Sequence, residues 1–581
     1  MRIENGTVLY GTTTVNEGGR IAADNIHNEG RFVVNYNSDN DYRMNFTGSG
    51  EMIKNGSGML NLSGNISLAG GVHVNAGGLV IDSQNFKAPI TTSKNTILSV
   101  KANNRLSGNI NNSGLAYMNN GASIDGTFYN NGSLALNSYG ESHVNNAAFG
   151  KTAYLPSVVT LGNYNGKAGS VISMGGVLAG DDSRTDKLII NGNASGQSQI
   201  FFRNENGSGA QTLNGINLIS VSGNSDAEFT LQNRVVAGGY DYSLQKGNIS
   251  GTDMKGWYLT SKEKRIRPES GSYTTNIQLA NTLFSLSKED RLTPSKDTSM
   301  WMRVVGGQSK MDMSDGQSTT TVNHYVQQLG GDIFNFKNNN IGDFKIGVMG
   351  GYAYAKGKTH NQYSGISSRN TLNGSTLGIY GSWEQYGKDQ QGAYADAWLQ
   401  YNWFSATVKG EQLDSEKYQI NGFTGSLEAG YNFKLNQWDN SDGSSVSFWM
   451  QPHIQGIWMG VNPDSHTEKN GTRVKEESGD NVQTKLGVKA FWKIEEPKKG
   501  DAKQEVRPYF EVNWINNSNL FSTGMNEETG FTTGTRNAGE AKVGIIGQAN
   551  DKLSIDIGLS HQSGNKGYQD TKGTLSLKYN F

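Results

Sequence analysis

The C-terminal half of the chain alternates apolar and polar residues over many short stretches. In 553–560, leucine and isoleucine occupy the odd positions, while serine, aspartate and glycine occupy the even ones. The stretches 393–404 and 482–493 follow the same period of two. This period puts successive side chains on opposite faces of a β-strand. The pattern therefore predicts strands with one apolar and one polar face.

These dyad-patterned stretches recur to the end of the chain. We expect strands near 298–307, 322–336, 343–357, 372–386, 392–408, 416–434, 446–461, 480–494, 506–516, 538–550, 552–564 and 567–581. An even number of crossings of about 10 residues each is what an outer-membrane barrel requires. The sequence thus predicts a twelve-stranded antiparallel transmembrane β-barrel over 298–581.

The parity of the alternation predicts which charged residues face the barrel lumen. A lysine or arginine that faces lipid at mid-depth costs about 2–4 kcal/mol, so the apolar face must be the outer one. The residues expected in the lumen are then Arg303, Glu384, Asp396, Glu428, Lys485, Lys489, Arg507, Glu511 and Asp556. They could hold a segment or a passing chain within the lumen, or only solvate a pore, and both interpretations stay open.

The N-terminal part, residues 1–156, has shorter alternations that are cut by Asn-Gly, Gly-Gly and Ser-Gly pairs. Examples are 6–10, 30–34 and 132–136. Many short strands with a recurring turn signal predict a right-handed parallel β-helix, because one coil cannot bury its inward side chains without a stacked neighbour. A sandwich or jelly roll is the competing interpretation.

Residues 157–270 continue the strand-like pattern with more aromatic residues. Within the run 186–196, Asp186 and Lys187 are charged neighbours at a turn. We interpret them as a solvated turn and not as catalytic residues.

A helix is predicted over 274–291, inside a linker at 271–297. Thr274 or Thr275 can cap its start and Pro294 ends it. One face carries Ile277, Ala280 and Phe284. Eighteen residues span about 27 Å, close to the thickness of the hydrocarbon layer. Such a helix can thread the barrel, whereas without a barrel it is an ordinary helix packed on a soluble domain.

Several stretches resemble autotransporters, the proteins of type V secretion. The stretch 48–81 resembles their passenger-associated repeat, 186–196 the end of a pertactin-like passenger, and 299–307 the first barrel strand. The resemblance implies a β-helical passenger on the cell surface and an outer-membrane barrel that anchors and translocates it. It also implies that 157–270 is a passenger cap, or autochaperone, which folds first outside the cell.

The resemblance extends to the two ends of the barrel region. Leu575, Leu577, Tyr579 and Phe581 resemble the C-terminal insertion signal of outer-membrane proteins. This implies three partners, namely outer-membrane lipid, the barrel-assembly machinery and periplasmic chaperones. In one group of autotransporters the passenger is released at an Asn-Asn pair in the linker helix. Asn276 and Asn281 are separated here, so we do not expect such self-cleavage.

Composition narrows these interpretations. The 581 residues contain 76 glycines and 8 prolines, and no G-X-Y period, which excludes collagen and favours many turns. Cysteine is absent, which excludes disulfides, thiol nucleophiles and zinc-cysteine sites and suits a chain that crosses the periplasm unfolded. The 51 basic and 52 acidic residues give no reason to expect a nucleic-acid partner.

Hydropathy excludes a helical membrane protein. No stretch of 18 apolar residues occurs, so a transmembrane helix is not expected. The mean hydropathy of −0.57 is compatible with barrel strands, which expose only alternate residues to lipid. Met1 opens directly into strand-and-turn sequence without a signal peptide, so we expect a fragment, a processed form or a truncated reading frame.

The sequence offers no recognisable catalytic site. Motifs such as G-x-S-x-G, H-E-x-x-H and the P-loop are absent, and the 8 histidines lack metal-like spacing. We expect no enzyme, no cofactor and no metal, and a passenger that serves adhesion or self-association. The alternatives are an outer-membrane channel with a truncated passenger and a surface enzyme.

Overall fold

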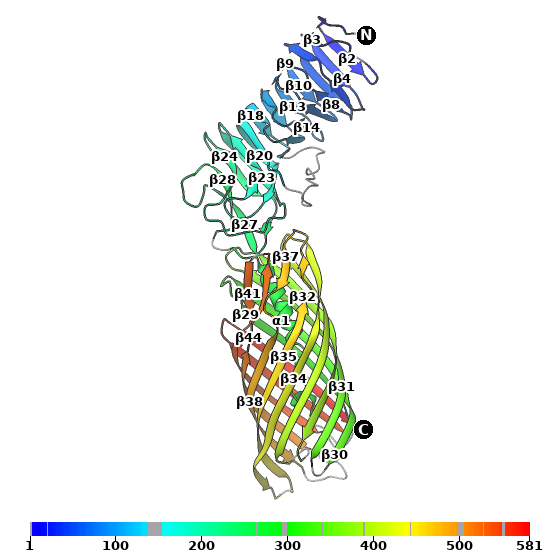
Figure 1. Cartoon of the computed structure of the whole chain (residues 1–581), viewed down its shortest axis with the longest axis vertical. Helices are drawn as coiled ribbons and strands as arrows, with labels where there is room; N and C mark the ends of the chain where they lie inside the picture. Colours follow the sequence, from blue (N-terminus) through cyan, green and yellow to red (C-terminus); the bar gives the residue numbers. More distant parts are fainter. Residues whose placement is uncertain are drawn as a thin grey trace. The chain divides into compact units, whose positions relative to one another are not determined.

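A computed structural model describes residues 3–19, 21–136, 154–262, 265–292, 299–338, 341–386, 390–441, 443–496, 505–526, 528–548 and 552–581. The chain divides into two compact units, Met1–Arg265 and Ile266–Phe581 (Figure 1). The predicted helix stop, Pro294, and the first predicted barrel residue, Thr298, lie outside the described residues.

The first unit begins as a β-helix in which short parallel strands stack in three columns. The first column stacks β1 (Val8–Leu9), β3 (Asn25–Asn28), β6 (Asn45–Gly48), β9 (Ile66–Leu68), β12 (Phe86–Lys87) and β15 (Arg105–Ser107). The second stacks β2 (Thr12–Asn16), β4 (Arg31–Asn35), β7 (Glu51–Asn55), β10 (Gly71–Val74), β13 (Ile90–Thr92) and β16 (Ile110–Asn112). The third stacks β5 (Asn40–Tyr42), β8 (Met59–Leu62), β11 (Gly78–Ile81), β14 (Ile97–Val100), β17 (Leu115–Met118) and β19 (Ser133–Ala135). β18 (Ser123–Asn130) continues the first two columns.

Each column buries one stack of apolar side chains along the axis of the β-helix. In the third column, Leu60, Leu79 and Leu98 are paired in register and fully buried. Fixed register places like residues above one another, so one coil completes the core of the next. The predicted parallel β-helix is confirmed.

The end of the first unit changes from parallel to antiparallel pairing. Its strands are β20 (Val158–Val177), β21 (Arg184–Thr185), β22 (Lys187–Ile190), β23 (Ala194–Asn204), β24 (Ile216–Val221), β25 (Glu228–Leu231), β26 (Val235–Ala237), β27 (Tyr240–Lys246) and β28 (Trp257–Thr260). β20 extends the columns, whereas β26, β27 and β28 form antiparallel pairs. A buried ion pair at 2.7 Å joins Arg234, the residue before β26, to Asp241 of β27. The antiparallel strands close the open end of the coil stack.

The interpretation of Asp186 as part of a solvated turn is wrong. Its carboxylate is buried and accepts hydrogen bonds from the backbone N–H groups of Ser157, at 2.8 Å, and Gly175, at 2.7 Å. These bonds tie β20 to the turn before β22. Burial raises the pKa of Asp186 to about 6, because an apolar environment disfavours the charged form. Lys187, its neighbour, is exposed.

The second unit is a closed antiparallel barrel of twelve strands, as predicted. They are β29 (Ser299–Asp312), β30 (Ser318–Asn338), β31 (Gly342–Asn361), β32 (Ser367–Glu384), β33 (Gly392–Gly410), β34 (Ser415–Asp439), β35 (Ser445–Pro463), β38 (Asn481–Glu495), β39 (Glu505–Asn517), β42 (Asn537–Gln548), β43 (Leu553–Gly564) and β44 (Gln569–Asn580). β29 pairs with β44, so the sheet has no open edge. No helix in the described part of the chain is long and apolar enough to span a membrane.

Two long loops at one end of the barrel carry a small antiparallel sheet that the sequence pattern did not predict. It consists of β36 (His466–Thr467), β37 (Arg473–Glu476), β40 (Phe521–Met525) and β41 (Glu528–Thr533). The strands are too short and too polar to show a period of two.

The predicted helix at 274–291 is wrong at both its start and its end. The helix α1 occupies Pro268–Thr282, and a single 3-10 turn follows at Glu289–Arg291. Pro268 at the first helical turn suits its fixed φ and missing N–H. The helix is about 22 Å long instead of 27 Å. Residues 285–287, between the helix and the 3-10 turn, are irregular.

Candidate functional site in the barrel lumen

The helix α1 lies inside the barrel, where strands surround it (Figure 1). Its side chains are buried except for the half-buried Gln278 and Thr282. On one side Leu279, Leu283 and Phe284 join an apolar cluster with side chains from β29 to β35. The rings of Phe284 and Phe404 stack with centroids 5.5 Å apart. Apolar packing therefore fixes α1 against one wall of the lumen.

Polar side chains of α1 find partners on the same wall. The Asn276 amide donates to the Tyr418 hydroxyl at 3.0 Å and accepts from Asn370 at 2.8 Å. Asn281 exchanges two hydrogen bonds with the backbone of Val461, at 2.7 and 3.0 Å. A buried amide stays favourable only when it is paired, and both asparagines are. Neither side chain is left unbonded in the helix.

A buried arginine fixes the N-terminal end of α1. The Arg267 guanidinium is fully buried and contacts Glu269 at 3.0 Å and Glu468 at 2.8 Å. Glu468 also accepts from the Tyr273 hydroxyl at 2.9 Å. Because Glu468 lies in a loop next to β36, this network joins the loop sheet to the first turn of the helix. A buried charge of this kind is costly unless it is paired, so the partners depend on one another.

Below α1 the linker is irregular, and the barrel wall satisfies its carbonyl groups. Phe284 O accepts from the amides of Gln328, at 3.0 Å, and Gln400, at 3.2 Å. Leu286 O accepts from Trp398 Nε1, at 3.0 Å, and Gln455 Nε2, at 2.9 Å. These donors replace the helical N–H groups. Extended backbone can therefore lie in the lumen without unpaired carbonyls.

Five of the nine predicted lumen residues contact this irregular segment. Arg303 donates to Ser285 O at 3.2 Å, and Glu428 accepts from the backbone N–H of Lys288 at 2.9 Å. Three ion pairs complete the set: Lys288–Glu384 at 2.6 Å, Lys489–Glu289 at 3.5 Å and Arg291–Asp396. Charges on β29, β32, β33, β34 and β38 thus converge on 285–291.

The other four predicted residues pair within the barrel wall. Lys485 lies 3.3 Å from Glu540, Arg507 contacts Glu505, and Glu511 lies 3.5 Å from Lys542. Asp556 accepts from the Tyr509 hydroxyl at 3.3 Å. These residues belong to β38, β39, β42 and β43, the wall opposite the apolar packing of α1.

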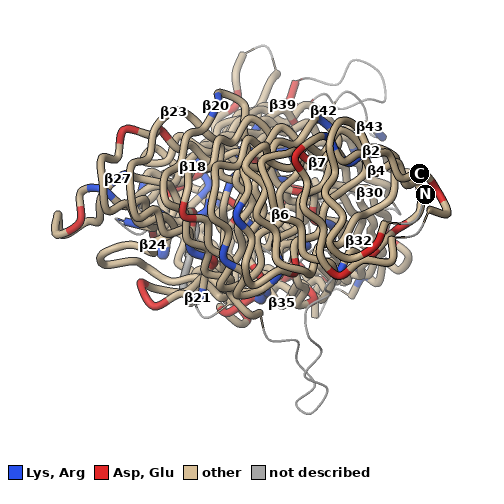
Figure 2. The backbone as a smooth tube through the Cα atoms, turned by 90° about the horizontal axis from the view of Figure 1, so that it is seen from above, with Lys and Arg blue, Asp and Glu red and all other residues tan. Residues whose placement is uncertain are grey.

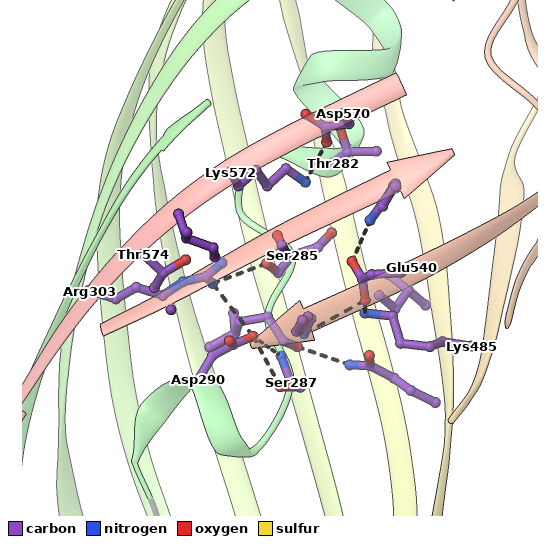
Figure 3. Close-up of a pocket in the computed structure, with 18 of the residues that line it drawn as sticks. Thr282, Ser285, Ser287, Asp290, Arg303, Lys485, Glu540, Asp570, Lys572 and Thr574 are labelled. Carbon is purple, nitrogen blue, oxygen red and sulfur yellow. Dashed lines mark hydrogen bonds and ion pairs between the residues drawn. The ribbon is translucent and has the colours of Figure 1, made fainter. Parts of the chain in front are cut away.

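A polar cavity of about 120 Å³ lies between the linker and this charged wall (Figure 3). Its charged lining is balanced: four cationic side chains face four carboxylates. The cations are Arg303, Lys485, Lys542 and Lys572, and the carboxylates are Asp290, Glu540, Asp556 and Asp570. A polar cavity of this size has room for several waters. The lumen therefore has an apolar side, which packs the helix, and a polar side.

Sequence reasoning missed the uncharged donors Gln328, Trp398, Gln400 and Gln455. It nominated only charged residues, although Gln400 shares the inward parity of Asp396. The lysine Lys578 on β44, which donates to Leu292 O at 2.8 Å, was missed as well. The alternation of inward and outward residues indicated both positions: Gln400 has the parity of the inward Asp396, and Lys578 follows the outward Leu577.

The four residues of the predicted insertion signal lie along β44 and just beyond its end. Leu575, Tyr579 and Phe581 are exposed and Leu577 is half-buried, while the residues between them are buried. The rings of Tyr579 and Phe581 meet edge to face, with centroids 5.4 Å apart. An apolar row thus faces outward on the strand that closes the barrel with β29.

Known protein families match two parts of the chain. The autotransporter beta-domain matches residues 300–560, and the autochaperone domain type 1 matches residues 129–244. The first match covers the barrel from β29 into β43, and the second covers the end of the coil stack with β26 and most of β27.

Two relatives of known sequence cover most of the chain. The autotransporter adhesin AIDA-I of Escherichia coli is 43% identical over 98% of this chain and 46% of its own length. The uncharacterized protein YdeU of Escherichia coli (strain K12) is 38% identical over 72% of this chain and 97% of its own length. The chain thus spans about half the length of the adhesin.

A solved structure supports the same assignment. The crystal structure of the transport unit of AIDA-I from Escherichia coli matches with a TM-score of 0.51 and 44% identity, over 55% of this chain and all of the solved one. Together with the closed barrel and the linker inside it, these likenesses place the barrel in the outer membrane and the passenger at the cell surface. The chain belongs to the autotransporter family.

Proposed function

We propose that the passenger acts by binding, in adhesion or self-association, and that it has no catalytic role. Two relatives carry adhesion in their names, AIDA-I and the adhesin/invasin TibA of Escherichia coli. Among the described residues, no three His, Asp or Glu side chains are grouped to hold a metal. The 51 basic and 52 acidic residues nearly balance, and Figure 2 shows both signs of charge spread over the backbone trace, which does not favour a polyanionic partner.

One feature of the β-helix carries the proposal. Asn16, Asn35, Asn55 and Asn75 form a ladder along the second column, with amide-to-amide hydrogen bonds of 2.9 to 3.0 Å. The ladder lies on the solvent side of the strands, because Phe32, Met52 and Val72 in the same strands are the buried ones. A row of identical amides at strand spacing can make weak, repeated contacts. Such contacts suit a surface that acts through many copies.

We propose that the chain is organised as a β-helix passenger at 1–156, then a cap, a linker and a barrel at 298–581. The predicted boundary between cap and linker at 270/271 falls inside α1, so we place it after Arg265, where the first compact unit ends. The match to an autochaperone and the antiparallel end of the first unit support the cap. Leu575, Leu577, Tyr579 and Phe581 are proposed as the signal for the assembly machinery, supported by their outward row on the closing strand.

We propose that the nine lumen residues divide into two roles. Arg303, Glu384, Asp396, Glu428 and Lys489 hold the linker and so anchor the passenger, as their contacts to 285–291 support. Lys485, Arg507, Glu511 and Asp556 keep the remaining lumen hydrated. Glu384→Gln with Asp396→Asn removes the carboxylates that pair with Lys288 and Arg291 from the barrel wall and leaves Lys288 only the 3.8 Å contact with Glu289 of the linker itself. We expect a higher conductance in planar bilayers. Glu511→Gln is the control and keeps the low conductance; equal conductance of the two variants contradicts the division.

Adhesion is tested on cells that export the full chain behind a functional signal peptide. Protease is added at a concentration that digests the passenger in lysed cells, and it should then also cleave the passenger on intact cells. Cleavage in lysed cells alone contradicts surface display. Binding to host-cell monolayers and settling of cell suspensions then measure adhesion and self-association.

The matched variants for this assay change only the solvent side of the coil. Asn35→Lys with Asn55→Lys introduces repulsion within the ladder, and both binding and settling should fall. Thr7→Lys, on a half-buried polar position outside the ladder, is the control. If ladder and control variants adhere like the parent chain, the ladder is not the binding surface. Hydrolase assays on the same cells test the enzymatic alternative.

A further inference from the structure

The outer wall of the barrel carries an apolar groove where its side chains become small. Over β32, β33 and β34 the outward positions are Gly381, Ala395, Ala397 and Ala429. They are neighbours across the sheet: Gly381 pairs with Ala397, and Ala395 pairs with Trp383 and Ala429. Together with the walls described next, they enclose a groove of about 520 Å³, here called the outer groove.

Large side chains bound the outer groove on both sides. Phe344 and Ile346 of β31, which are 39% and 54% exposed, stand on one side. Leu427 of β34 and Ile454 of β35, which are 72% and 50% exposed, stand on the other. The floor is open: a Cβ added at Gly381 would meet only the Lys345 carbonyl oxygen, at 3.7 Å. The groove is therefore a trough between ridges and not a gap that side chains fill.

The charged residues that underlie the groove turn away from it. Lys345, Asp396 and Glu428 are buried and lie on the lumen side of the wall. The surface that faces outward from the floor and the ridges is almost entirely carbon. An occupant with charged or hydrogen-bonding groups has nothing to pair with there, and it would be disfavoured by desolvation.

The depth of the groove in the membrane follows from the connections. Ile266 N–H, where the chain enters the barrel from the passenger side, donates to Gln317 between β29 and β30, at 3.4 Å, so this end of the barrel is the outer one. The groove lies near the opposite end. Phe344 is two residues into β31, and Trp383 is next to the last residue of β32. The groove thus opens toward the periplasmic leaflet.

An aromatic row marks the boundary of that leaflet at the groove. The rings of Phe336, Phe344 and Trp383 follow one another with centroids 6.5 Å apart. Trp383 Nε1 donates to the Ile341 carbonyl in the adjoining turn, at 2.7 Å. Aromatic residues concentrate at membrane interfaces, where lipid headgroups begin. A chain lying in the groove therefore starts at the headgroup level and runs toward the membrane centre.

We propose that the outer groove binds an acyl chain of a phospholipid from the periplasmic leaflet. The site faces hydrocarbon, has a carbon lining, and begins at an interfacial aromatic row. A saturated or unsaturated hydrocarbon chain satisfies all three conditions. A bound lipid fills the trough between the ridges and gives the barrel wall a continuous surface against the bilayer.

The test uses tryptophan quenching in the purified full chain, held in a mild detergent. The probe is phosphatidylethanolamine with dibrominated acyl chains, added at equimolar amounts. The contribution of Trp383 is the difference between the parent chain and Trp383→Phe. Trp492, which is exposed on the outer wall of β38, gives the reference through Trp492→Phe. We expect strong quenching of Trp383 and little quenching of Trp492.

Two substitutions, each at the same distance from the periplasmic end of its strand, complete the test. Ala397→Phe fills the groove and should abolish the quenching of Trp383. Ala490→Phe, on the outer wall of β38 and away from the groove, should leave it unchanged. Should Ala397→Phe fail to fold, as judged by heat-modifiable migration in gels, Leu427→Ala removes a ridge and should weaken quenching instead.

Three results overturn the proposal. The first is equal quenching of Trp383 and Trp492. The second is unchanged quenching in Ala397→Phe. The third is oxidative cross-linking of two chains through Ala395→Cys, which identifies a second copy as the occupant. Because the chain has no native cysteine, that cross-link is unambiguous.

Discussion

The β-helix and the barrel use the same period of two in opposite senses. In the coil stack the apolar residue of each pair is inside: Leu60 and Leu79 are fully buried. In the barrel the apolar residue is outside: Leu399 is 44% exposed, while Gln400 beside it is fully buried. Strand geometry is the same in both. The solvent outside the strands, water or lipid, decides which face is apolar.

The interiors differ accordingly. The coil stack has a packed apolar core, and its polar ladders face water. The barrel has a polar interior, and α1 with the irregular segment packs against one wall of it. The barrel supplies amide and guanidinium donors to the linker, because no helix satisfies the carbonyls of 284–286. The sharpest tests are substitutions that place a charge on the apolar face of a strand, either in the core of the coil stack or on the outer wall of the barrel.

The largest effect is expected from a charge in the core of the coil stack. Leu60→Asp removes a buried side chain and leaves a carboxylate with no partner, at a cost of more than about 4 kcal/mol. The passenger should lose protease resistance while the barrel stays folded. Asn61→Ala on the outward face is the control, and similar resistance of the two variants contradicts the burial.

A charge on the outer wall of the barrel comes next. Leu399→Arg should cost about 2–4 kcal/mol, because the guanidinium faces lipid near mid-depth. The midpoint of urea unfolding in vesicles measures it, and Leu399→Ala is the uncharged control. If Leu399→Arg unfolds at the same urea midpoint as Leu399→Ala, the side chain at 399 does not face lipid.

The buried Asp186 makes the stability of the passenger depend on pH. Its pKa, raised to about 6 by burial, exceeds that of the unfolded chain, so the native state binds more protons between pH 4 and 6. The stability from this group is present below pH 4 and falls by up to about 3 kcal/mol as the pH rises through 6. Asp186→Asn should lose this slope in denaturant midpoints measured from pH 4 to 7. Equal slopes in the parent and the variant show that the carboxyl is not responsible.

The smallest effect belongs to the solvent-exposed ladder. Asn55→Ala removes one donated and one accepted amide hydrogen bond, at 3.0 Å each. Water replaces both partners, so the loss of unfolding free energy should be about 1 kcal/mol or less. A loss as large as that of Leu60→Asp means that the ladder is part of the core.

The strands could be predicted because their two faces meet different surroundings, so apolar and polar residues alternate along the sequence. The number of barrel strands follows from this pattern. The helix start could not be predicted, since Glu269, Ser270 and Gly271 read as loop. In the barrel the first turns of α1 bury polar side chains as well as apolar ones, so no apolar stripe marks the start of the helix. Gly271 fits where a Cβ would lie 2.8 Å from Thr359 Cγ2.

The lumen site was predicted only in its charged part. Asp396 and Arg303 follow from the cost of charge in lipid, whereas Gln400 and Gln455 carry no such cost, and their inward parity was their only signal. Lys288 and Arg291 of the linker, which pair with Glu384 and Asp396 of the wall, lay in a segment that was predicted as a continuous helix. Where a carbonyl needs a donor cannot be read from a pattern of hydrophobicity.

One measurement tests the inverted alternation most directly. Single cysteines at 397 to 402 on β33 can be introduced into the cysteine-free chain, labelled with a fluorophore, and exposed to a lipid-soluble and a water-soluble quencher. We predict that 397, 399 and 401 respond to the lipid-soluble quencher, and that 398, 400 and 402 are shielded from it. A uniform response along the strand, or lipid contact at 398, 400 and 402, would contradict a barrel that is apolar outside and polar within.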